Sequence, residues 1–441
     1  MIKKIPPYDV LISQVLDELA QEHCVALIGL SNSGKSYLMR SIASDDIENA
    51  YQKTTGTHVV MIYVDCNRAV AISAQAFYEI VLRSAMERLS KVLRSDARDK
   101  LFAHHEAVTE AGTAFNASLS FNLALTELCE SADFDICFLL DEFDEIYAAL
   151  DERALLNLRA LRDRFLGQLM FITATARRHP HIRGADFQDE FSEMFSQATF
   201  PMPLLEEEQA NAMLTQCGIE FEDEEKKAVC IELAGGHLGM LLSISEVIRD
   251  LPAGSRQKLI EQVVRSPQPR AESLKLWSQL TDEERGYLEI LALESEAGVP
   301  DHVLSHLTSI GLLHKGEIFS PIFTKFIGAR ARSANVSERG VYLDPDSGDV
   351  WVDGIRIPVL TDLEFRLLKL LYDRRDKITD KYRIVVTVWG EDYLGDVDDA
   401  RVEKLVSRLR SKIEPDPAEP CYLITQRGRG YKLLSSPVRG S

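Results

Sequence analysis

Five short apolar runs, separated by longer amphipathic stretches, dominate the chain up to about residue 202. Each run has the length of a buried strand, and the stretches between the runs have the spacing of helices. Strands that alternate with helices in this way predict an α/β domain, a parallel sheet with helices on both faces. The expected strands are Val25–Gly29, His58–Asp65, Asp135–Leu140, Leu169–Thr175 and Ala198–Met202.

The pattern changes farther along the chain. From Leu204 to about Val264 the apolar positions have helical spacing only, and residues 276–327 add a short β-like piece, Leu312–Phe319. Residues 329–340 are rich in Arg, Ser and Ala and predict a linker. Short strands, three helices and a terminal hairpin follow. We therefore expect a core at 1–203, a helical lid at 204–268, a middle domain at 269–328, a linker at 329–340 and a C-terminal domain at 341–436.

Composition narrows the class of protein. The chain has 441 residues, enough for about three domains, and 45% of them are hydrophobic, as in ordinary soluble proteins. No apolar run approaches the roughly 18 residues of a membrane span. The N-terminal residues 1–7 contain no apolar run long enough for a signal peptide. The seven cysteines form no C-x-x-C pair, which predicts reduced core thiols and no zinc site. We expect a cytoplasmic protein with no membrane partner.

Charge is distributed unevenly along the chain. The net charge of −19 argues against a protein that coats nucleic acid without sequence preference. After residue 340 there are 17 Lys and Arg against 18 Asp and Glu, whereas the first 340 residues hold 33 against 51. The acidic excess is therefore almost entirely upstream, and the basic groups of the last hundred residues gather in two short segments.

A glycine-rich loop follows the first apolar run. Residues 29–36 read Gly-Leu-Ser-Asn-Ser-Gly-Lys-Ser and fit the pattern G-x-x-x-x-G-K-[ST] between a strand and a helix. The glycines let backbone N–H groups turn toward phosphates, Lys35 would reach the β- and γ-phosphates, and Ser36 would bind Mg²⁺. The alternative is an ordinary Gly/Ser turn. The candidate nucleotide-binding residues are Gly29, Ser31, Asn32, Ser33, Gly34, Lys35, Ser36 and Tyr37.

Two carboxylates follow the third apolar run. Asp141 and Glu142 come directly after Asp135–Leu140, at the carboxyl end of a strand, where open α/β sheets bind their ligands. Asp141 would order the metal ion, together with Ser36, and Glu142 would polarise the attacking water. Taken alone, the pair is equally consistent with an acidic strand end.

Two further candidates lie downstream. The fourth run ends in Thr173, Thr175 and Arg177, which could sense a terminal phosphate, although threonine is also common in strands for its β-propensity alone. In the helical segment, two glycines precede His237 at an expected helix start, where an imidazole can approach a phosphate. A loose glycine turn is the alternative there.

These four elements, in this order, resemble the AAA+ and STAND branch of P-loop ATPases, and the origin-recognition-like ATPases in particular. The resemblance covers about residues 9–265 and implies ATP or ADP with Mg²⁺ as ligands. Lys35 and Ser36 match the Walker A lysine and hydroxyl. Asp141 and Glu142 match the Walker B pair.

The lid and sensor positions match this family less completely. Thr175 or Arg177 matches the sensor-1 position, and His237 matches the lid histidine of the STAND motif, although Leu238 stands where that motif has proline. No sensor-2 arginine is present at its expected place, and the arginine finger is left open among Arg177, Arg178 and Arg183. We therefore expect slow ATP hydrolysis that acts as a switch.

Residues 398–412 predict an amphipathic helix. Val402, Leu405, Val406 and Leu409 form one apolar stripe, and basic and hydroxyl side chains face elsewhere. Such a helix can enter a DNA major groove, although a solvated charged face is the alternative. A strand, a basic glycine turn and a second strand follow at 424–434. The candidate DNA-binding residues are Arg401, Lys404, Ser407, Arg408, Ser411, Arg427, Arg429 and Lys432.

Residues 341–435 resemble the OmpR/PhoB winged-helix DNA-binding domain. The resemblance rests on Leu-Thr-Asp-Leu-Glu-Phe at 360–365, Val-Trp-Gly at 388–390, Ser-Arg-Leu-Arg at 407–410 and Arg-Gly-Arg-Gly-Tyr at 427–431. It implies that helix 401–411 enters the major groove of double-stranded DNA, that the wing meets the minor groove, and that loop 389–397 contacts RNA polymerase. The middle unit resembles the winged helix that follows the lid in origin-recognition-like ATPases.

No phospho-receiver domain precedes this winged helix; the ATPase occupies its place. We therefore expect a transcriptional regulator that binds specific DNA sequences under the control of ATP and ADP. Two alternatives are a DNA-stimulated ATPase that acts as an initiator or remodeller, and a STAND-type defence sensor. Paired half-sites on DNA would require at least a dimer, so a homo-oligomer is left open.

Overall fold

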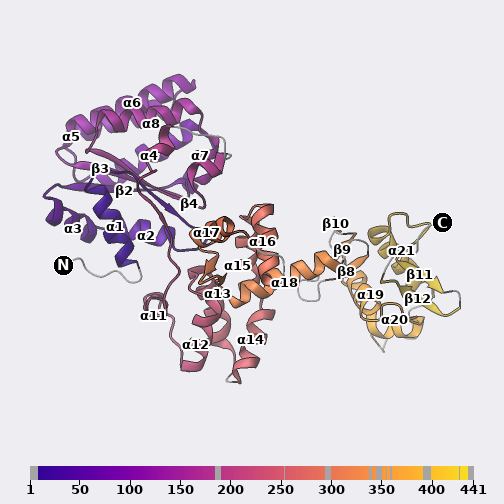
Figure 1. The fold of residues 1–441 in the computed structure, drawn as a ribbon. Helices are drawn as coiled ribbons and strands as arrows, with labels where there is room; N and C mark the ends of the chain where they lie inside the picture. The colour runs from indigo at the N-terminus through magenta and orange to yellow at the C-terminus, as the bar shows by residue number, and fades with distance from the viewer. Residues whose placement is uncertain are drawn as a thin grey trace. The chain divides into compact units, whose positions relative to one another are not determined.

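The computed structural model divides into two compact units, Met1–Lys325 and Phe326–Ser441. It describes residues 8–183, 190–252, 254–293, 299–336, 340–343, 350–353, 355–357, 360–390, 399–426 and 428–435. Each unit is described by itself below (Figure 1).

A five-stranded parallel sheet organises the first unit, in the order β2-β3-β4-β1-β5. The strands match the predicted ones to within one residue at each end. Strands β1 to β4 are almost entirely buried and so read as continuous apolar runs, whereas β5 is a partly exposed edge strand. Strand β4 lies between β1 and β3, with Ile28 of β1 opposite Thr175 and Leu140 of β3 opposite Thr173. The loops that follow β1, β3 and β4 therefore leave the sheet at one edge. The strands are β1 (Val25–Ile28), β2 (Val59–Asp65), β3 (Asp135–Asp141), β4 (Leu169–Thr175) and β5 (Thr199–Pro201).

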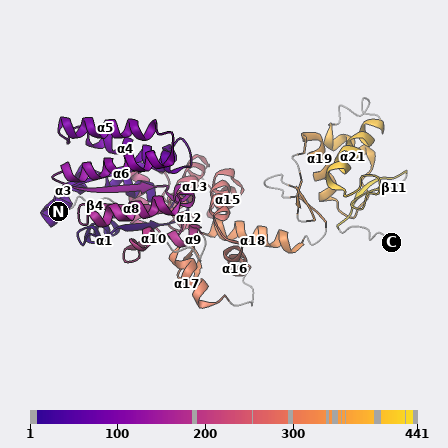
Figure 2. The ribbon, with the colours of Figure 1, turned by 90° about the horizontal axis from the view of Figure 1, so that it is seen from above.

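Helices cover both faces of this sheet. Helices α4, α5 and α6 pack on one another, with α5 outermost (Figure 2). Side chains from α4, α6 and α8 form the main hydrophobic core with β2, β3 and β4. These elements are α1 (Asp9–Leu19), α2 (Lys35–Ile42), α3 (Asp45–Thr55), η1 (Cys66–Arg68), α4 (Ala74–Leu89), α5 (Ser95–Thr109), α6 (Ala114–Ser131), α7 (Asp144–Ala149), α8 (Glu152–Arg164), α9 (His179–Arg183) and α10 (Glu190–Glu193).

The remainder of the first unit is mostly helical. The predicted lid contains α11 (Glu207–Gln216), α12 (Glu224–Ala234), α13 (Leu238–Asp250) and α14 (Arg256–Arg265). The middle segment contains α15 (Pro267–Ser278), α16 (Asp282–Ala292), α17 (Asp301–Ser309) and a hairpin of β6 (Leu313–His314) and β7 (Glu317–Ile318). Helix α15 packs against α13 of the lid. The short β-like piece expected at Leu312–Phe319 is thus this hairpin.

The predicted linker at 329–340 is wrong over most of its length. Helix α18 runs from Pro321 to Val336, so residues 329–336 are helical. A scarcity of large apolar side chains indicated a linker, but Ala and Arg are among the strongest helix formers and extend a helix that already started in apolar sequence. The boundary between the two units falls within α18.

After α18, the described residues of the second unit form helices and antiparallel strands. Strands β8 (Val341–Leu343), β9 (Val350–Val352) and β10 (Ile355–Arg356) form a sheet in the order β10-β9-β8. Helices α19 (Asp362–Asp373), α20 (Lys381–Val388) and α21 (Asp399–Ile413) follow, and the hairpin of β11 (Leu423–Gln426) and β12 (Gly430–Leu433) ends the unit. Its hydrophobic core is its own, drawn from 341–433. Among all the residues described, no helix is both long and apolar enough to cross a membrane.

Candidate functional site

The glycine-rich loop connects β1 to α2 as predicted. Gly34 has φ +102°, and a Cβ there would lie 2.2 Å from the Tyr8 hydroxyl, so only glycine fits. The Lys35 ammonium donates to the main-chain oxygens of Gly29 (2.6 Å) and Leu30 (3.2 Å), and this residue is 4% exposed. Burial lowers the pKa of Lys35, and nearby carboxylates oppose that shift. A buried lysine curled inside a loop of main-chain donors is suited to an anion such as phosphate.

The outer side of this loop is held by side chains from distant helices. The Ser31 N–H donates to Gln279 Oε1 (2.8 Å), and Gln279 Nε2 donates to Ser31 Oγ (2.9 Å). Asn32 Nδ2 donates to both carboxylate oxygens of Glu272, at 3.0 and 2.9 Å. The Tyr8 hydroxyl donates to the Ser33 carbonyl at 3.1 Å. Of the remaining predicted residues, Ser36 and Tyr37 lie in the first turn of α2, and the Tyr37 ring lies 6.1 Å from that of Tyr8.

The two predicted carboxylates lie at the end of β3. Asp141 is 1% exposed; its side chain accepts hydrogen bonds from the Tyr63 hydroxyl (2.7 Å) and the Glu142 N–H (3.0 Å). Glu142 has φ +51°, an uncommon conformation for a residue with a side chain. Burial raises the pKa of Glu142, and Lys35 opposes that shift. The structure thus brings the loop lysine and both carboxylates to one edge of the sheet, as expected from the sequence.

Strand β4 ends between these two groups. The Gly29 N–H donates to the Thr175 carbonyl (3.0 Å), which joins the start of the loop to β4. The Thr175 hydroxyl donates to the Arg177 carbonyl (2.7 Å), whereas the buried Thr173 hydroxyl has no hydrogen-bond partner among the described residues. Of the two threonines, it is therefore Thr173 whose hydroxyl is available to hydrogen-bond a ligand.

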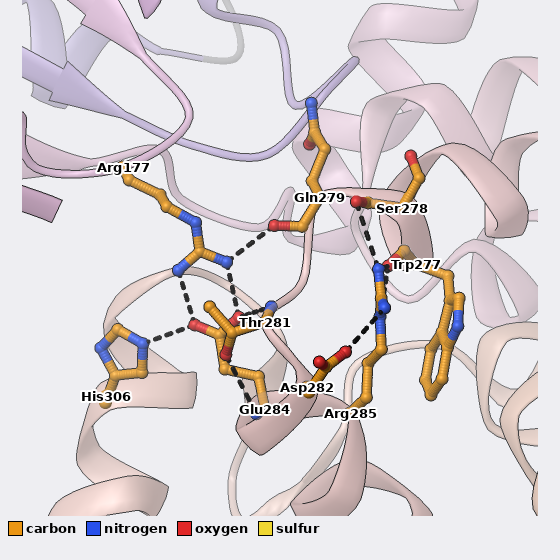
Figure 3. A network of polar contacts seen from close by, with 9 residues as sticks. All are labelled: Arg177, Trp277, Ser278, Gln279, Thr281, Asp282, Glu284, Arg285 and His306. Atoms are coloured by element: carbon orange, nitrogen blue, oxygen red, sulfur yellow. Dashed lines mark hydrogen bonds and ion pairs between the residues drawn. The ribbon is translucent and has the colours of Figure 1, made fainter. Parts of the chain in front are cut away.

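Arg177 does not point at the glycine-rich loop; it points at helix α16. Its guanidinium donates to both carboxylate oxygens of Glu284, at 2.7 and 2.5 Å, and to the main-chain oxygen of Gln279 at 2.7 Å (Figure 3). Glu284 also accepts from the Thr281 N–H (2.8 Å) and contacts His306 Nε2 (2.8 Å). The hydrogen bonds from Arg177 and His306 hold the pKa of Glu284 well below its usual range, although burial opposes them.

Arg178 and Arg183 were the other candidates for an arginine finger. Arg178 lines a pocket together with Arg177, His181 and His306. The Arg183 guanidinium lies over the Tyr147 ring, 5.6 Å from its centroid.

His237 caps the lid helix α13, as its predicted position at a helix start requires. Its Nδ1 accepts from the Met240 N–H at 3.3 Å, and its ring lies 5.4 Å from that of Phe319. Burial lowers the pKa of His237 to about 4, and the Lys35 ammonium adds to that shift. His237 also lines a small pocket with Gly29 and other loop residues, so a neutral imidazole faces this side of the loop.

Helix α21 of the second unit presents the predicted basic face. Its apolar stripe is buried, and the five predicted DNA-binding residues are exposed: Arg401, Lys404, Ser407, Arg408 and Ser411. The Ser411 hydroxyl donates to the Arg408 carbonyl of its own helix at 2.7 Å. Arg410, which the sequence did not single out, donates to the Leu423 carbonyl (3.0 and 2.6 Å) and so ties the helix to β11.

The hairpin of β11 and β12 forms the predicted wing. Arg429 is exposed and Lys432 is half-buried, opposite Ile424. Gly430 has φ +123°, and a Cβ there would lie 2.2 Å from the Thr379 oxygen. The predicted contact residue Arg427 and residues 391–397 of the predicted polymerase loop lie outside the described residues.

Two buried glutamates hold this unit together, and sequence reasoning missed both. Glu414 accepts from the main-chain N–H groups of Cys421, Tyr422 and Leu423 at 2.6–3.1 Å. Glu364 accepts from the Thr361 N–H (2.8 Å) in a capping box and from Lys412 Nζ (2.7 Å). The available signal was Thr-x-x-Glu at the start of α19, the sequence of a capping box.

Comparison with known proteins identifies the second unit. Residues 358–433 match the family described as "Transcriptional regulatory protein, C terminal". The uncharacterized transcriptional regulatory protein YrkP of Bacillus subtilis is 43% identical over 88 residues, which are 20% of this chain and 37% of that protein. The sensory transduction protein RegX3 of Mycobacterium leprae is 42% identical over 104 residues, 23% of this chain and 51% of that protein. The chain thus spans about a third to a half of the length of these curated relatives.

Solved structures match each part of the chain. The Aeropyrum pernix ORC2 protein, solved in ADPNP–ADP complexes, is 13% identical; the match covers 75% of this chain and 97% of that one, with a TM-score of 0.41. A Walker-type ATPase of Pyrococcus abyssi is also 13% identical, with coverage of 73% and 96% and a TM-score of 0.45. The RstA DNA-binding domain of Klebsiella pneumoniae, solved with its RstA box, is 27% identical, with coverage of 22% and 92% and a TM-score of 0.20.

The predicted fold class is confirmed for the sheet domain and for the C-terminal domain. The strand order and the glycine-rich loop after β1 are those of a P-loop α/β core. Residues 358–433 of the second unit are thus similar to the C-terminal domain of transcriptional regulatory proteins, and this unit follows an α/β unit with a glycine-rich loop after its first strand.

Proposed function

We propose that this protein is a transcriptional regulator whose DNA binding is controlled by ATP and ADP. One observation carries the proposal: a phosphate-binding loop with an adjacent carboxylate pair precedes a regulator's C-terminal domain in one chain. A nucleotide can control DNA binding only if it binds two states of the protein with different affinity. The two states would differ in whether helix α21 is available to DNA.

The first unit supplies the proposed switch. Main-chain N–H groups of 29–36 and the Lys35 ammonium would hold the phosphates, and Ser36 with Asp141 would hold Mg²⁺. Glu142 would orient the attacking water during slow hydrolysis, and burial raises the pKa of its carboxyl group. His237, neutral and buried beside the loop, would contact a phosphate as a hydrogen-bond donor through its other nitrogen.

The second unit supplies the proposed output. The exposed face of α21 would read base edges in the major groove, with Arg408 pairing to guanine, and Arg429 of the wing would contact the backbone. Residues 389–397 are acidic at Glu391, Asp392 and Asp396, and by the family resemblance this loop would contact RNA polymerase. Binding to paired half-sites would bring two copies of the chain together on DNA.

Selection from a genomic DNA library at physiological salt tests the proposal. The full chain is presented without nucleotide, with ADP, and with a non-hydrolysable ATP analogue, beside Lys35→Ala and the exposed-lysine control Lys53→Ala. We expect one nucleotide form of the wild type and of Lys53→Ala to enrich a defined motif, and Lys35→Ala to show no response to nucleotide. Enrichment that is the same in all three nucleotide conditions would refute nucleotide control.

A further inference from the structure

Three acceptor side chains from one short segment reach the proposed nucleotide site. Glu272 comes from the middle of α15, Gln279 from the turn after that helix, and Glu284 from the first turn of α16. Their donors are the Asn32 amide, the Ser31 N–H and the Arg177 guanidinium, respectively. All three donors belong to the loop or to the tip of β4. One segment of the middle region therefore accepts hydrogen bonds from the outer side of the glycine-rich loop and from Arg177, just after β4.

The pairing of Arg177 with Glu284 is the strongest of these contacts. It is bidentate, and the two side chains are 16% and 6% exposed. The planar guanidinium fork pairs with carboxylate and phosphate oxygens in the same geometry. Arg178, His181 and His306 line the pocket beside Arg177, so the surroundings of the guanidinium are basic and Glu284 is the acid that balances them. Anionic phosphate oxygens could replace the carboxylate oxygens and accept the same pair of hydrogen bonds from the guanidinium.

Thr175 and Gln279 both connect Arg177 to the glycine-rich loop. Thr175 is hydrogen-bonded through its carbonyl to Gly29, the first residue of the loop. Gln279 bridges both groups, because its side chain holds Ser31 while its main-chain oxygen accepts from Arg177 (Figure 3). A terminal phosphate in the loop and Glu284 in α16 are thus alternative partners on two sides of one side chain.

Glu284 is not left unpaired when Arg177 departs. Its carboxylate keeps the Thr281 N–H of the capping box and the contact with His306. Leaving a buried carboxylate without any partner would cost several kcal/mol of free energy. The two remaining partners of Glu284 reduce that cost. Glu284 therefore retains two partners if Arg177 leaves it.

We propose that Glu284 competes with the terminal phosphate of ATP for Arg177, so that ATP, unlike ADP, detaches helix α16 from the tip of β4. The proposal rests on the proposed nucleotide binding and deepens it, since it names the contact that distinguishes ATP from ADP. The closed contact lowers the affinity for ATP, and its release is the conformational event that nucleotide binding produces in the first unit. ADP has no phosphate at this position and leaves the contact intact.

Nucleotide affinities of the full chain test the competition. Glu284→Gln keeps an acceptor for the Thr281 N–H but removes the charge that holds Arg177. Glu283→Gln is the matched control, because Glu283 is exposed in the same helical turn and undergoes the same chemical change. We expect Glu284→Gln to tighten binding of a non-hydrolysable ATP analogue by about tenfold, to leave ADP affinity unchanged, and Glu283→Gln to change neither. Adding Arg177→Ala should abolish the gain.

Equal effects of Glu284→Gln on the ATP analogue and on ADP, or no effect on either, would overturn the competition. If wild type and Lys35→Ala bind neither nucleotide, the proposed nucleotide switch itself fails, which separates the two failures. Hydrogen exchange of the wild-type chain gives a second readout that requires no variant. The ATP analogue, but not ADP, should accelerate exchange in residues 282–292 of α16; identical exchange with both nucleotides would contradict the proposal.

Discussion

The two glycines of the wing should respond very differently to the same substitution. Gly428 (φ +70°) and Gly430 (φ +123°) lie two residues apart, and both require a positive φ. A Cβ at Gly428 would meet nothing within 4 Å, whereas a Cβ at Gly430 would lie 2.2 Å from the Thr379 oxygen. Gly428→Ala therefore measures the free-energy cost of a positive φ alone. Gly430→Ala adds the steric cost of the contact between the new Cβ and the Thr379 main chain.

The magnitude follows from what each alanine disturbs. Gly428→Ala adds about 1–2 kcal/mol of left-handed strain, partly offset by lower entropy of the unfolded chain, so we expect a loss of about 1 kcal/mol. Gly430→Ala has at least that strain and must also displace the Thr379 main chain. Two hydrogen bonds join Thr379 to Tyr431, at 2.8 and 2.9 Å, and losing both costs about 2 kcal/mol more. We expect a total loss of about 3 kcal/mol for Gly430→Ala.

Urea unfolding of segment 326–441 measures the difference, because this unit has a hydrophobic core of its own. Its fluorescence reports on Trp351 and Trp389. DNA binding by Gly430→Ala should fall with stability, since the wing is built on the Thr379 pairing. If both alanines cost the same free energy of unfolding, steric contact with Thr379 does not explain the glycine.

Three further predictions concern other parts of the molecule. The Glu414 carboxylate accepts hydrogen bonds from buried N–H groups, and Glu414→Gln turns an amide toward them. In urea unfolding, this change should destabilise segment 326–441 by about 2–4 kcal/mol. The exposed control Glu419→Gln should leave the stability unchanged. In binding titrations, Arg408→Ala should weaken specific DNA by about 1–3 kcal/mol more than random DNA, whereas Arg429→Ala should weaken both similarly; equal losses for Arg408→Ala would refute base reading. Burial lowers the pKa of His237 to about 4, so this side chain binds a proton more readily in the unfolded chain than in the folded one. The free energy of unfolding should therefore fall by about 3 kcal/mol as the pH drops from 6.5 to 4. In urea titrations, His237→Asn should remove that part of the pH dependence.

Much of the fold could be predicted from the sequence, because local patterns determine it. Strands β1 to β4 are almost entirely buried, so continuous apolar runs mark them. Helix α21 has one buried stripe, and its apolar spacing marks the face that points inward. The loop at 29–36 and the carboxylates after β3 were predictable because a parallel sheet places the ends of neighbouring strands together.

The remaining features depend on contacts between residues that are far apart in the chain. Arg177 and Glu284 are separated by 107 residues, and nothing local to either identifies the other as its partner. Arg410 lies in a basic helix, yet its role is to hold β11, and only the fold distinguishes it from Arg408. The linker was mispredicted because a helix rich in small and charged residues has the same composition as a linker.

The same five-residue sequence pattern begins a helix in both units of the chain. Residues 280–284 read Leu-Thr-Asp-Glu-Glu and residues 360–364 read Leu-Thr-Asp-Leu-Glu, and in each case the last glutamate is 4% exposed and completes a capping box. One of these glutamates pairs with Arg177 and the other with Lys412. The cap fixes the side chain locally, so the identity of its cationic partner is free to vary. In evolutionary terms, such a helix already presents a fixed, buried carboxylate. A duplicated or transplanted domain then needs only one well-placed cation on a neighbouring element to pack against it in a defined way.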